Sequence, residues 1–215
     1  MEVSIIIAVH NAERYIGRAI RSALDQKFDK NTFEVIVVND GSTDNTSKIL
    51  DYYSNRIKII NLKKNKGLPY ARNEGIRSSK GRFIVCLDAD DYIHTDLIYI
   101  ESMFLYLNPH WDAVSCDYTI VNEYEEHMKR VDGGEESIAC GVMFRVERLI
   151  DIGLYSPEFE ANEEKDLLIR FKKKKNVVKN IELPLYRYRQ HSSNMSKKKD
   201  VIKKYDKMLK QKHKL

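Results

Sequence analysis

The sequence lacks the features that mark several large classes of protein. No stretch has the roughly 18 uncharged apolar residues of a membrane-spanning helix, and residues 1–4 lack the basic start of a signal peptide. We therefore expect a cytoplasmic protein. The three cysteines, Cys86, Cys116 and Cys140, are odd in number and lack metal-ligand spacing, so we expect buried thiols instead of disulfides.

Two common nucleotide-binding motifs are also missing. No Gly-x-Gly-x-x-Gly follows the first predicted strand, which argues against a dinucleotide site. No Gly-x-x-x-x-Gly-Lys-Ser/Thr occurs anywhere, which argues against a P-loop.

Charge is divided unevenly along the 215 residues, a length that suits one sizeable α/β domain. The net charge is +5, but residues 172–215 hold 16 basic and 3 acidic side chains. Such a split suggests a basic segment that meets an anionic partner, and a solvated lysine-rich tail is the alternative. The lysines lack interleaved aromatic residues, so we expect no nucleic-acid partner.

Strand-like and helix-like segments alternate, which predicts a mostly parallel sheet flanked by helices. Residues 3–9 form a continuous apolar run, typical of a strand that is buried on both faces. The charged stretch 123–136 contains two glycines and is predicted to be a mobile loop near the site. Further strands are predicted at 33–38, 57–62, 83–87, 113–121, 141–144 and 177–188, and helices near 15–24, 44–53, 68–78, 96–107 and 162–174.

Three carboxylates cluster directly after the apolar run 83–87. Asp88, Asp90 and Asp91 stand at the carboxyl end of a predicted buried strand, where open α/β sheets bind ligands. Carboxylates this close repel one another, and a hard divalent cation that also binds phosphate oxygens would hold them together. The sequence therefore predicts a metal-bridged phosphate site. The alternative is a polar turn in which one Asp caps the helix that begins near Asp96.

Polar residues also follow the first two predicted strands. His10 and Asp40 would lie side by side at the end of the sheet, where they form a slot for a planar base. His10 would stack on that base, and Asp40 would accept a hydrogen bond from its ring N–H. An ordinary loop histidine is the alternative for His10.

Seven ordered segments match the motifs of one known family. They lie at residues 4–13, 37–44, 65–67, 71–73, 87–91, 163–167 and 188–191, and an ordered series is far rarer by chance than a single motif. Together they resemble glycosyltransferase family 2, over roughly residues 3 to 196. The resemblance implies the GT-A fold and an inverting, metal-dependent transferase that uses a nucleotide-diphosphate sugar, with a UDP-sugar favoured.

The resemblance also implies roles for single residues. Asp90 and Asp88 would bind Mn²⁺ or Mg²⁺, which prefer oxygen ligands, and Asp91 would support them from the outer shell. His191 would approach the metal or diphosphate after the C-terminal loop closes, with an exposed tail histidine as the alternative. The donor nucleotide sugar would be bound by Ala8, His10, Asn11, Asp40, Arg72, Asp88 and Ala89. The family more often has Pro and Tyr where this chain has Ala8 and His10.

Arg72 would contact the ribose or diphosphate, because a planar fork of donors suits phosphate oxygens. The alternative is a surface ion pair with Glu74 or Asp44.

Glu164 falls on the family's catalytic carboxylate, where Asp is commoner. Inversion needs a general base opposite the leaving group, which takes the proton from the acceptor hydroxyl. Glu163 is the next candidate, and Asp166 flanks both at the start of a predicted helix. Acids there also simply complement the helix dipole, which is the alternative reading of the cluster.

The resemblance further implies a single domain at residues 1–196, with a nucleotide-sugar-binding half at 1–108 and an acceptor-binding half at 109–196. The processive motif Gln-x-x-Arg-Trp is absent, so we expect transfer of a single sugar to a glycan or lipid-linked acceptor, in cell-surface polysaccharide or glycoconjugate synthesis.

A basic helical tail is expected at 197–215. Its apolar face would contact the inner face of the membrane, its own domain or the second subunit of a homodimer. That face is formed by Val201, Ile202, Tyr205, Met208 and Leu209.

Two other function classes stay open. A non-catalytic nucleotide-sugar-binding module is compatible with the substitutions at Ala8, His10 and Glu164. A nucleotidyltransferase has a similar sheet and metal chemistry, but the glycine-rich phosphate loop expected near its start is absent.

Overall fold

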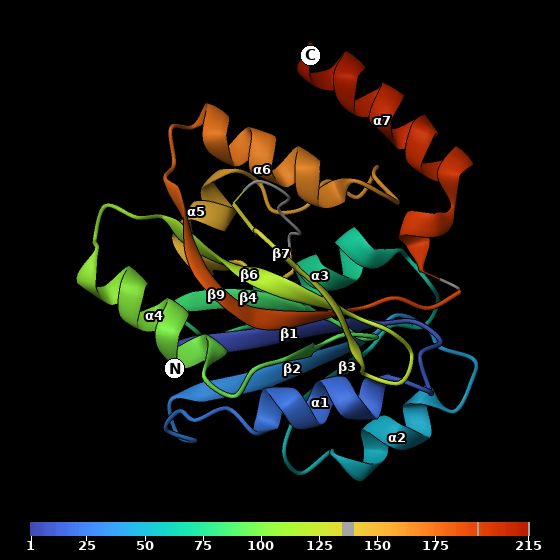
Figure 1. The fold of residues 1–215 in the computed structure, drawn as a ribbon. Coiled ribbons are helices and arrows are strands. Elements are labelled where there is room, and N and C mark those ends of the chain that lie inside the picture. The colour runs from blue at the N-terminus through green and yellow to red at the C-terminus, as the bar shows by residue number, and fades with distance from the viewer. Residues whose placement is uncertain (135–139, 193, 215) are drawn as a thin grey trace.

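The computed structural model describes residues 1–134, 140–192 and 194–214. It shows one mixed sheet with helices on both faces (Figure 1). The first half of the chain contributes four parallel strands, as predicted from their apolar runs. These elements are β1 (Val3–Val9), α1 (Ile16–Leu24), β2 (Phe33–Asn39), α2 (Thr46–Tyr52), β3 (Lys58–Asn61), α3 (Leu68–Arg77) and β4 (Phe83–Asp88).

The second half extends the same sheet with strands of both directions. Its elements are β5 (Tyr92–Ile93), α4 (Leu97–Leu107), β6 (Ala113–Val121), β7 (His127–Val131), β8 (Met143–Arg145), α5 (Val146–Asp151), α6 (Glu163–Lys173), β9 (Val178–Arg189), a 3-10 helix (Met195–Lys197) and α7 (Lys199–His213). The strand order is β3-β2-β1-β4-β8-β6-β9-β5, and β7 pairs with β6. β8 is antiparallel to β4, so the predicted parallel arrangement holds for the first half only.

The hydrophobic core lies on both faces of the sheet because successive strand residues point to opposite sides. Ile5 and Ile7 of β1 pack in the cluster that includes α1 and α2, whereas Ile6 packs in the cluster that includes α3. Glycine is required where α3 crosses β1, since a Cβ on Gly75 would lie 2.4 Å from Cγ2 of Ile6. This close approach brings the polar residues of α3 down to the end of β4.

The prediction of a loop at 123–136 is wrong for the middle of that stretch. Residues 127–131 form β7, which pairs antiparallel with β6, and residues 135–136 lie outside the described residues. Among the described residues β7 pairs with β6 alone, and exposed charged side chains such as Lys129 and Arg130 suit such an edge strand, since they discourage pairing with other molecules. The charged residues that led to the prediction of a loop therefore belong to an edge strand.

The C-terminal tail forms a helix that packs on its own domain, which is one of the three contacts predicted for it. Tyr205 and Leu209 of α7 are buried against Phe159 and Ala161. Membrane contact through this helix and the homodimer stay predictions. Within the described residues, no helix is both long and apolar enough to cross a membrane. The prediction of buried thiols is confirmed, since all three cysteines are buried and free of disulfides.

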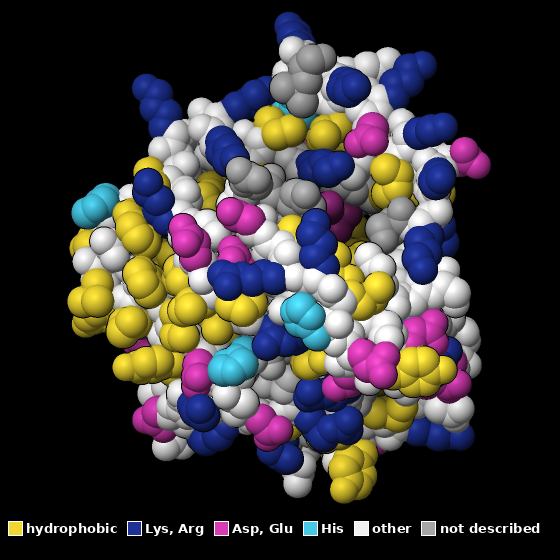
Figure 2. All heavy atoms as spheres, in the orientation of Figure 1, with side chains coloured by type: hydrophobic (Ala, Val, Ile, Leu, Met, Phe, Trp, Pro, Cys, Tyr) yellow, Lys and Arg dark blue, Asp and Glu magenta, His cyan; other side chains and the backbone are white. Residues whose placement is uncertain are grey.

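Helix α4 differs from an ordinary surface helix, which is apolar inside and polar outside, because it is apolar on its outward face as well as on most of its buried face. Its outward face is apolar, and Figure 2 shows hydrophobic side chains gathered over this helix at the left of the view. Glu101 is its only charged residue and is fully buried. Neither carboxyl oxygen makes a hydrogen bond of ordinary geometry to the described residues. Burial raises the pKa of Glu101 well above its usual value, which the Cys116 thiol offsets only in part.

Replacing Glu101 by an apolar residue should stabilise the domain. Glu101→Met keeps the length of the side chain and removes two unpaired buried oxygens, so we expect the free energy of unfolding to rise by about 1–3 kcal/mol. Glu101→Gln is the matched control, because its amide stays polar and unpaired, and it should change stability by less than about 1 kcal/mol. Urea unfolding measures both variants. A loss of stability in Glu101→Met would contradict the prediction.

Candidate active site

The acidic cluster lies at the carboxyl end of β4, as predicted. The carboxylate oxygens of Asp88, Asp90 and Asp91 come within 4.8 Å of one another. Asp88 and Asp90 are each about 30% exposed, whereas Asp91 is buried. The alternative, in which one Asp of this turn caps the next helix, is not supported, because the N-cap of α4 is Asp96, which lies outside the turn.

Asp91 anchors the end of β9 beneath the site. Its carboxylate accepts hydrogen bonds from the backbone N–H of Arg189 and from the hydroxyl of Tyr186, both at 2.7 Å. Burial, together with the charges of Asp90 and Asp88, raises the pKa of Asp91 well above its usual value. Asp91 thus holds the end of β9 beneath the cluster, and the outer-shell role toward a metal that the resemblance implies stays a prediction.

His191 reaches the acidic cluster from the segment after β9. Its Nε2 lies 2.8 Å from Oδ2 of Asp90, and its ring stacks on Tyr15 with the centroids 4.7 Å apart. The histidine is 6% exposed, so the alternative of an exposed tail residue is wrong. Burial raises the pKa of Asp90, and the charge of Asp88 adds to this effect.

The cluster fits a hard divalent cation. Its donors are carboxylate oxygens on one short turn, which are the ligands that Mg²⁺ and Mn²⁺ prefer. Asp88 and Asp90 are the two with exposed surface and would hold the ion, with His191 beside Asp90. A cation there would relieve the repulsion that raises the pKa of Asp90.

Arg72 connects the acidic cluster to α6. From α3 it donates to Oδ1 of Asp88 and to Oε1 of Glu163, each at 2.7 Å, and it is only 3% exposed. It also approaches Sγ of Cys140 at 3.1 Å. The alternative of a surface ion pair with Glu74 or Asp44 is wrong. Arg72 is buried, and it bridges Asp88, which is 16 positions away in the sequence, and Glu163, which is 91 positions away.

Glu163 and Glu164 begin α6 side by side. Asn162 adopts a left-handed backbone conformation before them, with φ of 59°, and turns the chain into the helix. Glu163 is buried against Arg72, whereas Glu164 is partly exposed. Burial and the neighbouring Glu164 carboxylate raise the pKa of Glu163 to about 8, although Arg72 acts in the opposite direction. Glu163 therefore supports Arg72, and Glu164 has the freer carboxylate.

The raised pKa of Glu163 should make stability depend on pH. The folded protein holds this proton more tightly than the unfolded chain, so the stabilisation is full below pH 4.5 and is lost as the pH rises through about 8. We expect the stability of the wild type relative to Glu163→Gln to fall between about pH 5 and about pH 8. Urea unfolding of both proteins across this range tests it. Parallel stability curves would contradict it.

Asp40 and His10 lie together at the ends of β2 and β1, as predicted. The Asp40 carboxylate accepts the backbone N–H groups of Lys66 and Gly67, each at 2.8 Å. His10 is exposed, and its Nδ1 donates to the backbone oxygen of Asp40 at 2.8 Å. A hollow of about 480 Å³ lies along the loop after β3, whose Lys66 donates its backbone N–H to Asp40. It is lined by Asn61, Leu62, Lys63, Lys64 and Lys66.

Three further residues were predicted to bind the donor nucleotide sugar, and they lie in or beside the loops that follow β1 and β4. Asn11 has a positive φ of 51°, and its Oδ1 accepts the backbone N–H of Thr43 at 2.7 Å. It thereby joins the loop after β1 to the loop after β2. Ala8 and Ala89 are buried where β1 and β4 end.

Sequence reasoning missed the residues of β9 that hold the site together. Besides its backbone bond to Asp91, Arg189 donates from Nε to the backbone oxygen of Asp90 at 2.8 Å and from its guanidinium to Glu125 at 2.9 Å. No local pattern signals this role, because the partners are 99 and 64 positions away.

Comparisons with known proteins identify the family of this chain. A model of the family described as Glycosyl transferase family 2 matches residues 4–157. The putative glycosyltransferase EpsH of Bacillus subtilis is 38% identical over 133 residues, which are 60% of this chain and 37% of that protein. The poly(ribitol-phosphate) beta-N-acetylglucosaminyltransferase TarS of Staphylococcus aureus is 36% identical over 108 residues, 49% of this chain and 19% of that protein. The chain thus spans less than two fifths of either relative.

Solved structures share the fold. TarS residues 1–349 in complex with UDP-GlcNAc align with a TM-score of 0.81 at 24% identity, over 92% of this chain and 61% of that chain. The mannosyltransferase PcManGT of Pyrobaculum calidifontis, in complex with GDP-Man and Mn²⁺, aligns with a TM-score of 0.72 at 16% identity, over 90% and 58%.

Proposed function

Since the chain belongs to glycosyl transferase family 2, we propose that it transfers a single sugar, with inversion, from a nucleotide-diphosphate sugar to a hydroxyl group of an acceptor. The acceptor would be a glycan or a lipid-linked glycan in cell-surface polysaccharide or glycoconjugate synthesis. The relatives named above are a putative glycosyltransferase and a polymer-modifying glycosyltransferase, which supports this class of reaction.

The observation that carries the proposal is the buried bridge of Arg72. It joins Asp88, in the half proposed to bind the donor, to Glu163, the neighbour of the proposed base. A single displacement needs the attacking oxygen about 3–3.5 Å from the carbon that it attacks, in line with the leaving group. A shared buried arginine would fix Asp88 on the side of the leaving group relative to Glu163 on the side of the base.

Glu164 would act as the general base. It would accept the proton of the acceptor hydroxyl while that oxygen bonds to the anomeric carbon and the bond from that carbon to the diphosphate breaks, with its electron pair leaving on the diphosphate. Asp88 and Asp90 would hold Mn²⁺ or Mg²⁺, which neutralises charge on the departing diphosphate. Arg72 is near enough to Asp88 to add positive charge on the same side.

The donor base would lie at the ends of β1 and β2. Lys66, which lines the hollow, donates its backbone N–H to Asp40, and the exposed His10 at the end of β1 would stack on the base. Because two backbone N–H groups fix the Asp40 carboxylate, its direction is set before the base arrives. A UDP-sugar is favoured, and the TarS fragment that shares this fold is described in complex with UDP and with UDP-GlcNAc.

An anionic acceptor would suit the C-terminal part of the chain. Residues 172–215 hold 16 basic and 3 acidic side chains, and Figure 2 shows dark blue side chains along the upper and right-hand edges, where Figure 1 has α7. The poly(ribitol-phosphate) in the name of TarS is a phosphate polymer. Attraction between such a polymer and the lysines would weaken as salt is added.

Calorimetric titration with UDP, GDP, dTDP and CDP tests the proposal, each with Mn²⁺ and with EDTA. We expect tight binding of one nucleotide, with UDP first, and loss of that binding in EDTA. The sugar donor of that nucleotide should then release nucleoside diphosphate when acceptor is added. Failure of all four nucleotides to bind would overturn the donor site, and release of pyrophosphate from a nucleoside triphosphate would favour a nucleotidyltransferase.

A further inference from the structure

The last helix of the chain packs on the helix that carries the proposed base. Tyr205 of α7 packs on Phe159, which precedes α6, with ring centroids 6.1 Å apart. Nearer the start of α6, Nδ2 of Asn162 donates to Oδ1 of Asp206 at 2.9 Å. The residue immediately before Glu163 is thus held by a side chain of α7.

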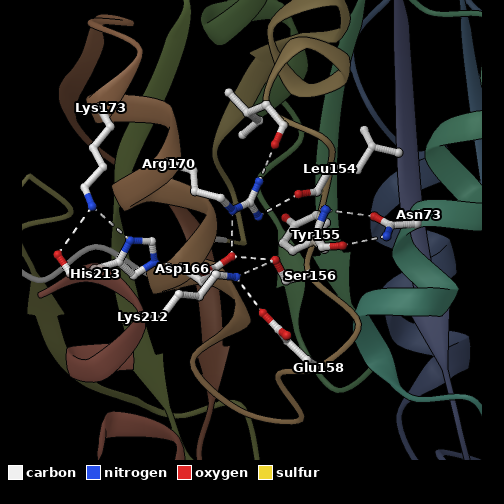
Figure 3. A network of polar contacts seen from close by, with 11 residues as sticks. Asn73, Leu154, Tyr155, Ser156, Glu158, Asp166, Arg170, Lys173, Lys212 and His213 are labelled. Atoms are coloured by element: carbon white, nitrogen blue, oxygen red, sulfur yellow. Dashed lines mark hydrogen bonds and ion pairs between the residues drawn. The ribbon is translucent and has the colours of Figure 1, made fainter. Parts of the chain in front are cut away.

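Asp166 is the main junction between the two helices (Figure 3). It is fully buried in the first turn of α6, and its two carboxylate oxygens take four polar partners. Oδ1 accepts Nε2 of His213 and Nζ of Lys212, both at 2.9 Å. Oδ2 accepts Oγ of Ser156 at 2.9 Å and Nε of Arg170 at 2.7 Å.

The hydrogen bonds of His213 fix which of its nitrogens carries the hydrogen. Nδ1 lies 3.2 Å from Nζ of Lys173, which can only donate. Nε2 is therefore the nitrogen that donates to Asp166. Burial alone would raise the pKa of Asp166, but hydrogen bonds from Lys212, His213 and Arg170 lower it to about 2, so the junction holds an ionised carboxylate.

The junction continues toward Arg72 on its other side. Arg170 donates to the backbone oxygens of Ile152 and Leu154, at 2.6 and 2.7 Å. The next residue, Tyr155, exchanges two hydrogen bonds with the side chain of Asn73 on α3, at 2.8 and 3.0 Å. Asn73 follows Arg72 directly in the sequence, so one chain of contacts runs from the end of α7 to the residue beside the Asp88–Glu163 bridge.

We propose that the last turn of α7 positions the proposed catalytic carboxylate: His213 and Lys212 act through Asp166 to hold the first turn of α6, which keeps Glu163 against Arg72 and sets the position of the adjacent Glu164. This inference rests on the proposed function. Asp166 lies two residues after Glu164, within the same helical turn, so movement of its carboxylate moves the backbone of the base. His213 and Lys212 are positioning residues, because they contact neither substrate nor the reacting atoms.

Loss of the contacts at Asp166 should affect catalysis more than donor binding. A displacement of about 1 Å in a base can cost about 10²-fold in rate, because proton transfer needs a short, aligned contact. The donor site is built on the ends of β1, β2 and β4, and the junction reaches it only indirectly, through Asn73 and the neighbouring Arg72. Loss of the junction should therefore lower kcat and leave donor affinity unchanged.

The test compares three variants in full-length protein. His213→Ala removes the donor to Asp166 and should lower kcat about 10-fold or more, with the donor KM and the Mn²⁺-dependent nucleotide affinity within about two-fold of wild type. His213→Gln should restore most of kcat, because its amide both donates and accepts at the same end. Gln211→Ala is the matched control, since Gln211 is exposed on the same turn of α7.

Amide hydrogen exchange gives a readout that needs no turnover. In His213→Ala, peptides that cover residues 159–170 should exchange faster, and peptides of β1 and β4 should be unchanged. Full kcat in His213→Ala, unchanged exchange in α6, or failure of the glutamine to restore either property would each overturn the proposal. A wild type that binds nucleotide but transfers no sugar would overturn the proposed function instead, and the exchange data would still decide whether α7 positions α6.

Discussion

Glu164→Gln should abolish most sugar transfer and leave donor binding intact. The amide cannot take the acceptor proton, and loss of a general base costs about 10²- to 10⁴-fold in rate. Glu164 is partly exposed at the start of α6, whereas its neighbour Glu163 is buried against Arg72 and already holds a structural partner. Measurement of kcat and of nucleotide affinity by calorimetry in the same preparation separates the two effects.

Two further variants make the assignment specific. Glu164→Asp keeps a carboxylate and should retain more activity than Glu164→Gln, although the shorter side chain reaches less far. Glu163→Gln resembles the protonated carboxyl group that the raised pKa favours below about pH 8, so it should keep the hydrogen bond from Arg72 and lower activity far less than Glu164→Gln. Equal transfer by wild type and Glu164→Gln would assign the base elsewhere. Intact nucleotide binding without any wild-type transfer would favour the non-catalytic binding module.

Asp90→Asn should remove metal-dependent nucleotide binding. An amide oxygen carries no charge, so the site loses one of the two exposed carboxylates that would hold the cation. We expect the affinity for nucleotide in Mn²⁺ to fall by more than the roughly 10- to 100-fold that removal of an outer-shell partner costs. In EDTA, wild type and variant should bind nucleotide equally weakly.

A second aspartate in a similar setting is the control for Asp90. Asp96 is 31% exposed and lies 3.6 Å from Nδ1 of His94, whereas Asp90 is 30% exposed and lies 2.8 Å from Nε2 of His191. Asp96→Asn therefore removes a charge from the same kind of ion pair, away from the cluster, and should leave nucleotide binding unchanged. If both variants lose binding equally, or if Asp90→Asn retains its response to Mn²⁺, the metal site is not at Asp90.

Local patterns were sufficient to predict the first half of the fold. Runs such as 3–9 and 83–87 are buried on both faces, which is typical of parallel strands that are covered by helices. The pattern failed at β7, where exposed charges on an edge strand resemble a loop. It also gave no direction for β8, because strand direction depends on which neighbour the strand finds.

The candidate site was predictable where it follows strand ends. Asp40, Asp88 and Asp90 are found at the carboxyl ends of β2 and β4, because parallel strands bring these ends to one edge. The partners of these residues were not predictable. Tyr186 and Arg189 contact the cluster from about 95 positions later in the chain, and no spacing rule links them to it.

The sequence by itself determined the parallel half-sheet, the carboxylates at its edge, the acids at the start of α6 and the basic end of the chain. Each of these follows from residue type and local period, which decide what is buried and where a strand ends. Only the tertiary structure decided that Arg72 joins Asp88 to Glu163, that Asp91 supports β9 and that α7 docks on Asp166. These contacts depend on which buried faces meet. The hydrophobic period of a segment shows which of its faces is buried, but it does not show which other segment covers that face.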